Sequence, residues 1–184
     1  MSEHDIVAPS AWVVRWAHLV RRGPVLDLAC GSGRHARFFA ARGLEVVAVD
    51  REPQAFDSPR IRFVQADLEG GRPWPFGEGG FGGIVVANYL HRPLFARLAG
   101  ALAPGGVLLY ETFMAGNERY GRPSNPEFLL RPGELLAAFA SLAARGYEEG
   151  LVESPKRAVM QRLCAVRPGE GIESRAKRIP AEQA

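Results

Sequence analysis

The stretch that most limits the fold of this chain is an apolar run followed by a glycine turn, a helical pattern and a second apolar run. Residues 25–29 form the first run, the turn contains Gly31 and Gly33, apolar positions at helical spacing follow over 34–42, and 44–49 form the second run. This order predicts a strand–helix–strand unit whose two strands pair in parallel. A parallel sheet needs cover on both faces, so the unit indicates an α/β protein.

The same alternation continues along the chain. We expect helices over 10–22, 34–42, 94–102 and 132–145, and strands over 25–29, 44–49, 61–66, 82–87, 107–111, 147–152 and 158–166. Pro53 and Pro59 leave room for barely one helical turn after Asp50, and 113–130 form a long irregular loop. The last two strands are close enough for an antiparallel hairpin. The pattern therefore predicts a seven-stranded, mostly parallel α/β sheet with an antiparallel C-terminal hairpin and helices on both faces.

Length and composition favour one domain. The 184 residues suit a single core, which we place over 1–168 with the helix 10–22 included, and 169–184 are polar enough to form a disordered tail. The net charge of +3 and the absence of a basic stripe argue against nucleic acid as a partner. Two cysteines support neither a disulfide framework nor a metal site, so no metal is expected. With no apolar leader and no apolar run of membrane length, we expect a cytoplasmic protein without a membrane partner.

The glycine turn fits two kinds of nucleotide-derived ligand. The order Gly31, Gly33, Ala36, followed by Asp50 after the next strand, matches the dinucleotide pattern G-x-G-x-x-A with its distal acid. Asp27, however, lies inside the end of the first strand, where a dinucleotide fold favours apolar residues. A carboxylate at that place suits a ligand whose end carries an ammonium group.

These motifs together resemble the class I S-adenosylmethionine-dependent methyltransferases. The segment 25–33 (VLDLACGSG) resembles their first motif, Asp50 and Asp67 match their ribose-side and adenine-side acids, and 102–106 (LAPGG) resembles the turn before their fifth strand. The resemblance covers residues 24–167 and implies a Rossmann-like fold. Within the class, two further segments resemble the small tellurite-resistance-type methyltransferases: 88–94 (NYLHRPL) and 111–118 (ETFMAGNE).

The resemblance implies a set of cofactor-binding residues. Asp50 would accept hydrogen bonds from both ribose hydroxyls, Asp67 would accept one from the adenine amino group, and the Leu68 N–H would serve a ring nitrogen. The remaining residues of the set face the methionine part of S-adenosylmethionine: Asp27, Ala29, Gly31, Gly33 and Asn88.

The acceptor side offers three candidate catalytic residues. If the acceptor carries a proton, His91 is the first candidate for a base and Tyr89 the second, while Glu111 would orient the acceptor or His91. The structural alternatives are that His91 bonds a loop carbonyl and that Glu111 pairs with Arg92. Three loop arginines either attract an oxyanion or pair with Glu118, Glu127 and Glu134, and the pairing is favoured: Arg119, Arg122 and Arg131.

The predicted function is methyl transfer from S-adenosylmethionine to a small-molecule acceptor by in-line displacement. A nicotinamide-dependent oxidoreductase and a catalytically silent S-adenosylmethionine-binding module are the alternatives. Two departures from the family bear on the choice: 81–84 (FGGI) replace an acid at the start of the fourth strand, and the helix after Asp50 is nearly absent. The second departure removes cover from the adenine side.

Overall fold

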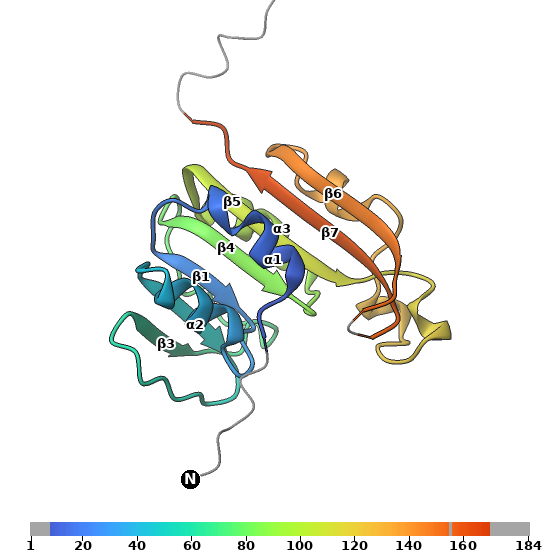
Figure 1. Ribbon diagram of the computed structural model, residues 1–184, viewed down its shortest axis with the longest axis horizontal. Coiled ribbons are helices and arrows are strands. Elements are labelled where there is room, and N and C mark those ends of the chain that lie inside the picture. The colour runs from blue at the N-terminus through green and yellow to red at the C-terminus, as the bar shows by residue number, and fades with distance from the viewer. Residues whose placement is uncertain (1–7, 155, 170–184) are drawn as a thin grey trace, which may run out of the picture.

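The protein, described here by a computed structural model over residues 8–154 and 156–169, is built around one seven-stranded sheet with the strand order β3-β2-β1-β4-β5-β7-β6 (Figure 1). The strands are β1 (Val25–Leu28), β2 (Val46–Asp50), β3 (Ile61–Gln65), β4 (Phe81–Ala87), β5 (Leu102–Phe113), β6 (Ala143–Val152) and β7 (Ala158–Val166). Strands β1 to β5 pair in parallel, and β7 runs antiparallel between β5 and β6. The predicted sheet is confirmed. Of the predicted tail, all but Gly169 lies outside the described residues.

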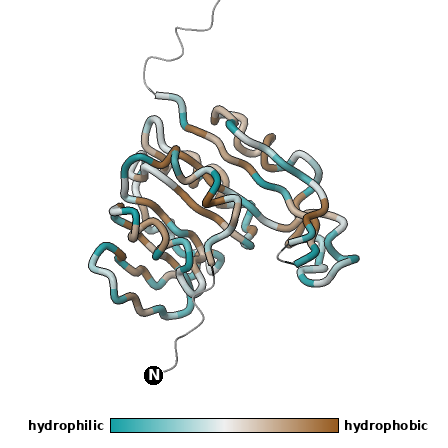
Figure 2. Tube along the Cα trace, viewed as in Figure 1, coloured by the Kyte–Doolittle hydropathy of each residue, from teal (hydrophilic) through white to brown (hydrophobic). Residues whose placement is uncertain are grey.

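Helices cover both faces of the sheet, as predicted. They are α1 (Ala11–Trp16), α2 (Arg34–Ala41), α3 (Phe95–Ala101) and α4 (Glu134–Ala138), with short 3-10 turns η1 (Ala17–Leu19), η2 (Arg92–Leu94), η3 (Asn117–Arg119) and η4 (Pro126–Phe128). Phe39 of α2 belongs to the core on one face, and Leu98 of α3 belongs to the core on the other. Hydrophobic residues follow the central strands in Figure 2 because both faces of a parallel sheet are buried. In the described part of the chain, none of the helices has both the length and the apolar character to cross a membrane.

Several predicted elements have different bounds, and three of them differ in ways that matter here. The helix expected over 132–145 is wrong beyond α4, since β6 begins at Ala143 and pairs with β7 from the partners Ala143 and Val166 onward. Pairing along a long hairpin overrides the helical spacing of these apolar residues. The first helix ends earlier than predicted, although Ser10 caps it by accepting a hydrogen bond from the Val13 N–H at 3.3 Å. Strand β5 begins already at Leu102, which pairs with Phe81.

Close packing against the segment before β1 explains why glycines stand at the start of β4. The Gly82 N–H donates to the Pro24 carbonyl at 3.0 Å, and a Cβ on Gly82 would overlap the backbone oxygen of Arg22. A Cβ on Gly83 would crowd the Val20 side chain at 2.7 Å. The segment before β1 therefore occupies the space that an acidic side chain would need at this point.

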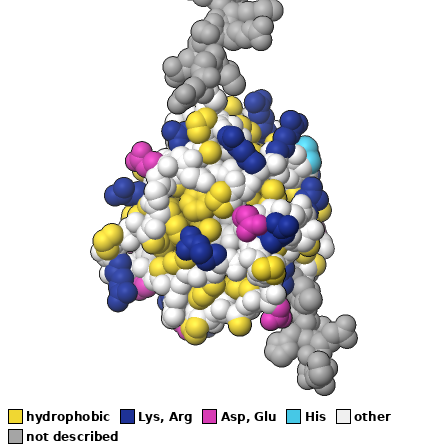
Figure 3. Space-filling model, turned by 90° about the vertical axis from the view of Figure 1, so that its left-hand side faces the viewer, with side chains coloured by type: hydrophobic (Ala, Val, Ile, Leu, Met, Phe, Trp, Pro, Cys, Tyr) yellow, Lys and Arg dark blue, Asp and Glu magenta, His cyan; other side chains and the backbone are white. Residues whose placement is uncertain are grey.

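The crossover from β2 to β3 contains no helix over the described residues 51–60, as predicted. Phe56 instead packs on this side of the sheet, with its ring centroid 6.1 Å from that of Phe63 and the Arg37 guanidinium 5.0 Å from its centre. The ring lies so close to Gly33 that a Cβ there would overlap it. Viewed from the β3 side, the molecule exposes hydrophobic side chains with basic side chains between and around them (Figure 3).

Candidate active site

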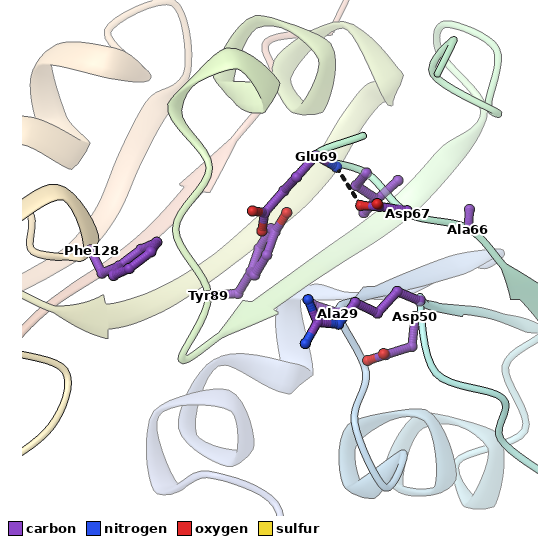
Figure 4. A pocket seen from close by; sticks show the side chains of 9 residues that line it. Ala29, Asp50, Ala66, Asp67, Glu69, Tyr89 and Phe128 are labelled. Carbon is purple, nitrogen blue, oxygen red and sulfur yellow. Dashed lines mark hydrogen bonds between the residues drawn. The ribbon is translucent and has the colours of Figure 1, made fainter. Parts of the chain in front are cut away.

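The carboxyl ends of β1, β2 and β3 open into a cavity of about 380 Å³, here called the strand-tip cavity. Its wall consists of Ala29, Asp50, Arg51, Ala66, Asp67, Leu68, Glu69, Tyr89 and Phe128 (Figure 4). Open parallel sheets place their ligands at this edge. The fold thus brings together four residues that the sequence predicts as cofactor-binding, from three separate loops: Ala29, Asp50, Asp67 and Leu68.

Asp50 is held in place by backbone groups on both sides. Its Oδ2 accepts a hydrogen bond from the Gly31 N–H at 2.8 Å, and its Oδ1 accepts one from the Glu52 N–H at 3.0 Å. A carboxylate oxygen can accept a second hydrogen bond. The two oxygens are therefore fixed side by side at the cavity wall, in a geometry that suits a pair of adjacent hydroxyls.

Asp67 organises the next loop in a similar way. Its Oδ1 accepts hydrogen bonds from the Glu69 N–H at 2.9 Å and the Gly70 N–H at 3.2 Å, the first of which is drawn in Figure 4. Its Oδ2 accepts none within the described chain. Asp67 therefore caps a turn and keeps one oxygen available for an amino group.

Two non-glycine residues of the described chain have a left-handed backbone, and both were predicted to bind the methionine part. They are Ala29, with φ of 50°, and Asn88, with φ of 56°, at the ends of the neighbouring strands β1 and β4. This conformation is unfavourable for a residue with a side chain, and such residues are concentrated at ligand sites. Nothing in the sequence pattern indicated this backbone geometry.

Asp27 lies behind the glycine turn and does not line the strand-tip cavity. Its side chain is buried, and its Oδ2 accepts a hydrogen bond from the Ala36 N–H at 2.8 Å. The His35 Nδ1 lies 3.9 Å from the other oxygen. Burial raises the pKa of Asp27 to about 7 and lowers the pKa of His35 to about 4. Asp27 thus anchors the start of α2, and its contact with an ammonium group stays a prediction.

A second cavity of about 640 Å³, here called the basic cavity, opens beyond the ends of β4 and β5. Residues 8–11, the loop after β5 and the tip of the β6–β7 hairpin complete its wall. One carboxylate lines it, Glu111, against five cations: Arg34, Arg122, Lys156, Arg157 and Arg162. Asn88 lines this cavity and its neighbour Tyr89 lines the strand-tip cavity, so both cavities reach the end of β4.

Glu111 is nearly buried in the wall of the basic cavity and pairs with Arg162, not with Arg92. The two residues are cross-strand partners on β5 and β7, and the Arg162 Nε lies 3.3 Å from the Glu111 Oε2. Glu148, the partner of Arg162 on β6, lies on its other side at 3.4 Å. This row of alternating charges fixes the Glu111 carboxylate.

The other two predicted catalytic residues lie elsewhere. Tyr89 lines the strand-tip cavity and points toward Glu69 (Figure 4), and burial together with Glu69 raises its pKa. His91 lines a third cavity of about 680 Å³, whose wall also contains Trp74 and Arg97. Its ring makes no hydrogen bond to a loop carbonyl within the described residues. Only Glu111 of the three therefore lines the basic cavity, and a role for His91 as base stays a prediction.

Arg92 fixes the loop that reaches over the strand-tip cavity. Its Nε and Nη2 donate to the Glu134 carboxylate at 2.6 and 3.0 Å, and its Nη1 and Nη2 donate to the carbonyls of Glu127 and Leu129 at 2.7 and 2.8 Å. These bonds place the half-exposed Phe128 at the cavity wall. The predicted pairing of Glu134 with a loop arginine is wrong, and sequence reasoning missed Phe128 because nothing distinguished it within the loop.

Replacing Arg92 with glutamine should lower the free energy of unfolding by about 2 kcal/mol, because charge-assisted hydrogen bonds are lost and Glu134 loses its partner. Burial opposes ionisation of Glu134, but the bonds from Arg92 and the Arg131 N–H lower its pKa overall. Such a group stabilises the fold above its unfolded pKa of 4.5 and loses this contribution as pH falls through the lower folded value. Urea titrations should show the full difference at pH 7 and a smaller one below about pH 4.5, whereas Arg97→Gln should behave like the wild type at both.

Comparisons with known proteins find similarity to methyltransferases. Residues 25–106 match a family model described as a methyltransferase domain. Over 97 residues the chain is 37% identical to trans-aconitate 2-methyltransferase of Paracidovorax citrulli, covering 46% of this chain and 36% of that protein. The chain therefore spans about a third of the length of this relative.

The solved structures that share the fold include the following two. TehB from Haemophilus influenzae is 17% identical, with a TM-score of 0.71 over 88% of this chain and 63% of that one. The 1,6-didemethyltoxoflavin-N1-methyltransferase of Burkholderia thailandensis, solved with 1,6-didemethyltoxoflavin and S-adenosylhomocysteine, is 24% identical, with a TM-score of 0.61 over 86% of this chain and 76% of that one. Both likenesses concern the fold.

Proposed function

We propose that this chain is a class I S-adenosylmethionine-dependent methyltransferase and that it transfers the methyl group of S-adenosylmethionine to a small-molecule acceptor. One observation carries the proposal. The strand-tip cavity and the basic cavity both reach the end of β4, where Tyr89 lines the first and Asn88 the second, so a donor in the first can be directed toward an acceptor in the second.

The residues of the strand-tip cavity suit the donor. Asp50 presents two fixed oxygens to the ribose hydroxyls, and Asp67 keeps one oxygen for the adenine amino group. The left-handed backbone of Ala29 and Asn88 lies between these acids and the basic cavity, where the amino-acid end would extend. Phe128 and Tyr89 line the cavity on the side away from Asp50 (Figure 4).

Methyl transfer requires little of the protein beyond holding the donor and the acceptor in the right positions. Bound S-adenosylmethionine supplies an activated methyl group, and the residues around it hold the acceptor in line and exclude water. Glu111, fixed by Arg162, lines the acceptor side and can orient a donor group of the acceptor. Tyr89 and His91, which line other cavities, are not needed for an acceptor that carries no proton to remove.

The two alternative functions find less support. A nicotinamide oxidoreductase would favour a parallel sixth strand, whereas β7 and β6 are antiparallel in this sheet. A silent binding module was suggested by the short crossover after Asp50. Phe56 occupies part of that side of the fold and packs against Gly33 and Phe63.

Incubation with S-adenosylmethionine labelled in its methyl group should move label into a small molecule, with S-adenosylhomocysteine formed in equal amount. Trans-aconitate is the first acceptor to test, because the relatives are named for it. An extract of bacterial metabolites is the second. Binding of S-adenosylhomocysteine without transfer to any acceptor would support the silent module, and binding of NAD alone would support the oxidoreductase.

A further inference from the structure

We propose that His35 is a positioning residue for methyl transfer, because its ring holds residues 8–11 in place as a wall of the basic cavity. This inference rests on the proposed function and names a residue that acts on the same site from behind its wall. Residues 8–11 and Arg34 line the basic cavity, whereas His35, the next residue of α2, does not. Its effect on the site therefore depends on what its ring binds.

The His35 ring bonds the N-terminal segment directly. The Ser10 N–H donates a hydrogen bond to the His35 Nε2 at 3.2 Å, between residues 25 positions apart in the chain. The ring is buried, with 3% of its surface exposed. Burial and the neighbouring Arg34 charge lower the pKa of His35 to about 4. The ring is therefore neutral near neutral pH, and its Nε2 has a lone pair for the Ser10 N–H.

The other ring nitrogen of His35 faces Asp27. Since Nε2 accepts a hydrogen bond, the neutral ring carries its proton on Nδ1, which lies 3.9 Å from the Asp27 Oδ1. The second oxygen of Asp27 accepts a hydrogen bond from the Ala36 N–H at 2.8 Å. A row of Ser10, His35 and Asp27 thus connects the N-terminal segment to β1, just before the glycine turn.

Residues 8–10 have little else to hold them. Within the described chain, one further hydrogen bond joins them to the fold beyond α1, from the Arg34 Nη1 to the Ala8 carbonyl at 3.5 Å. The bonds from the Val13 and Val14 N–H groups to Ser10 belong to the start of α1 itself. Loss of the His35 acceptor would therefore leave residues 8–10 attached by one long hydrogen bond and by their continuation into α1.

The wall that His35 holds lies on the acceptor side. Residues 8–11 line the basic cavity together with Asn88 and Glu111, and they do not line the strand-tip cavity. In-line transfer requires an acceptor held in position and water excluded from it. A wall that moves away lowers both, while Asp50 and Asp67 still hold the donor. We therefore expect loss of the His35 acceptor to slow methyl transfer without weakening donor binding.

Two substitutions of Ser10 isolate this hydrogen bond. Ser10 has φ of −60° and ψ of 141°, values that proline adopts, so Ser10→Pro removes the N–H without straining this residue. Ser10→Ala keeps the N–H, and both variants lose the hydroxyl that caps α1. The difference between the two variants therefore measures the bond to His35.

The test has two readouts. One is the initial rate of label transfer from saturating S-adenosylmethionine into the extract of bacterial metabolites, and the other is hydrogen exchange of the amides of residues 11–16. We expect Ser10→Pro to transfer label about tenfold more slowly than Ser10→Ala and to exchange about tenfold faster. With His35→Leu added to each, the two should agree within about twofold, because the acceptor is already gone. His35→Gln alone, whose amide oxygen can accept the bond, should remain close to the wild type.

Two controls separate positioning from general damage. His18→Leu makes the same substitution at an exposed histidine near α1 and should transfer label at the wild-type rate. His35→Leu should bind S-adenosylhomocysteine within about threefold of the wild type by calorimetry. Equal rates of Ser10→Pro and Ser10→Ala, or a loss of donor affinity in His35→Leu as large as its loss of rate, would overturn the positioning role while the proposed function stands. A wild-type chain that transfers no label would instead overturn the proposed function, on which this role rests.

Discussion

Replacing Asp50 with alanine should weaken S-adenosylhomocysteine binding about 100-fold, because two charge-assisted hydrogen bonds to the ribose are lost together. The Asp50 carboxylate also holds the Gly31 N–H at 2.8 Å, so the variant loosens the glycine turn as well. Asp50→Asn keeps one acceptor oxygen and should give an intermediate loss. Isothermal titration calorimetry measures all three affinities.

Asp57→Ala is the matched control for this prediction. Asp57 is an exposed acid on the same crossover and does not line the strand-tip cavity. Its replacement should leave affinity unchanged within about twofold. Equal affinities of the Asp50→Ala variant and the wild type would mean that the ribose is held elsewhere.

Replacing Gly82 with alanine should lower the free energy of unfolding by about 3 kcal/mol or more, because the new methyl group would overlap the backbone oxygen of Arg22. The segment before β1 would have to move, which also strains the hydrogen bond from the Gly82 N–H to Pro24. In a domain of this size the melting temperature should fall by about 6 to 12 °C.

Gly100→Ala provides the opposite case in the same fold. Gly100 lies in α3, and a Cβ there would meet nothing within 4 Å. Alanine is the better helix former, so this variant should be more stable by about 0.5 to 1 kcal/mol. If calorimetry showed that Gly82→Ala and Gly100→Ala change the melting temperature equally, this result would contradict the close approach of Arg22 to β4.

The sequence predicted the elements whose signal is local. Strand β7 was expected over 158–166 and has those bounds, and the crossover after Asp50 lacks a helix because Pro53 and Pro59 interrupt it. Residues 139–145 were mistaken for helix because their apolar spacing is helical, whereas 139–142 form a turn and 143–145 pair with β7 as the start of β6. Such pairing depends on a strand that comes later in the chain.

The part of the site that lies at the ends of strands could be predicted from the sequence. Asp50 and Asp67 both come directly after buried strands, so parallel packing brings them to one edge. The partners of Glu111 and Arg92 were missed, because cross-strand register and loop closure decide them. The left-handed backbone of Asn88 and the place of Phe128 have no sequence signal of their own.

A crystal structure of the chain with S-adenosylhomocysteine tests the central claim most directly. We expect the adenosine in the strand-tip cavity, both ribose hydroxyls within hydrogen-bond distance of the Asp50 carboxylate, and the sulfur directed past Asn88 toward the basic cavity. A ligand seated outside this cavity, or a ribose with no contact to Asp50, would contradict the account.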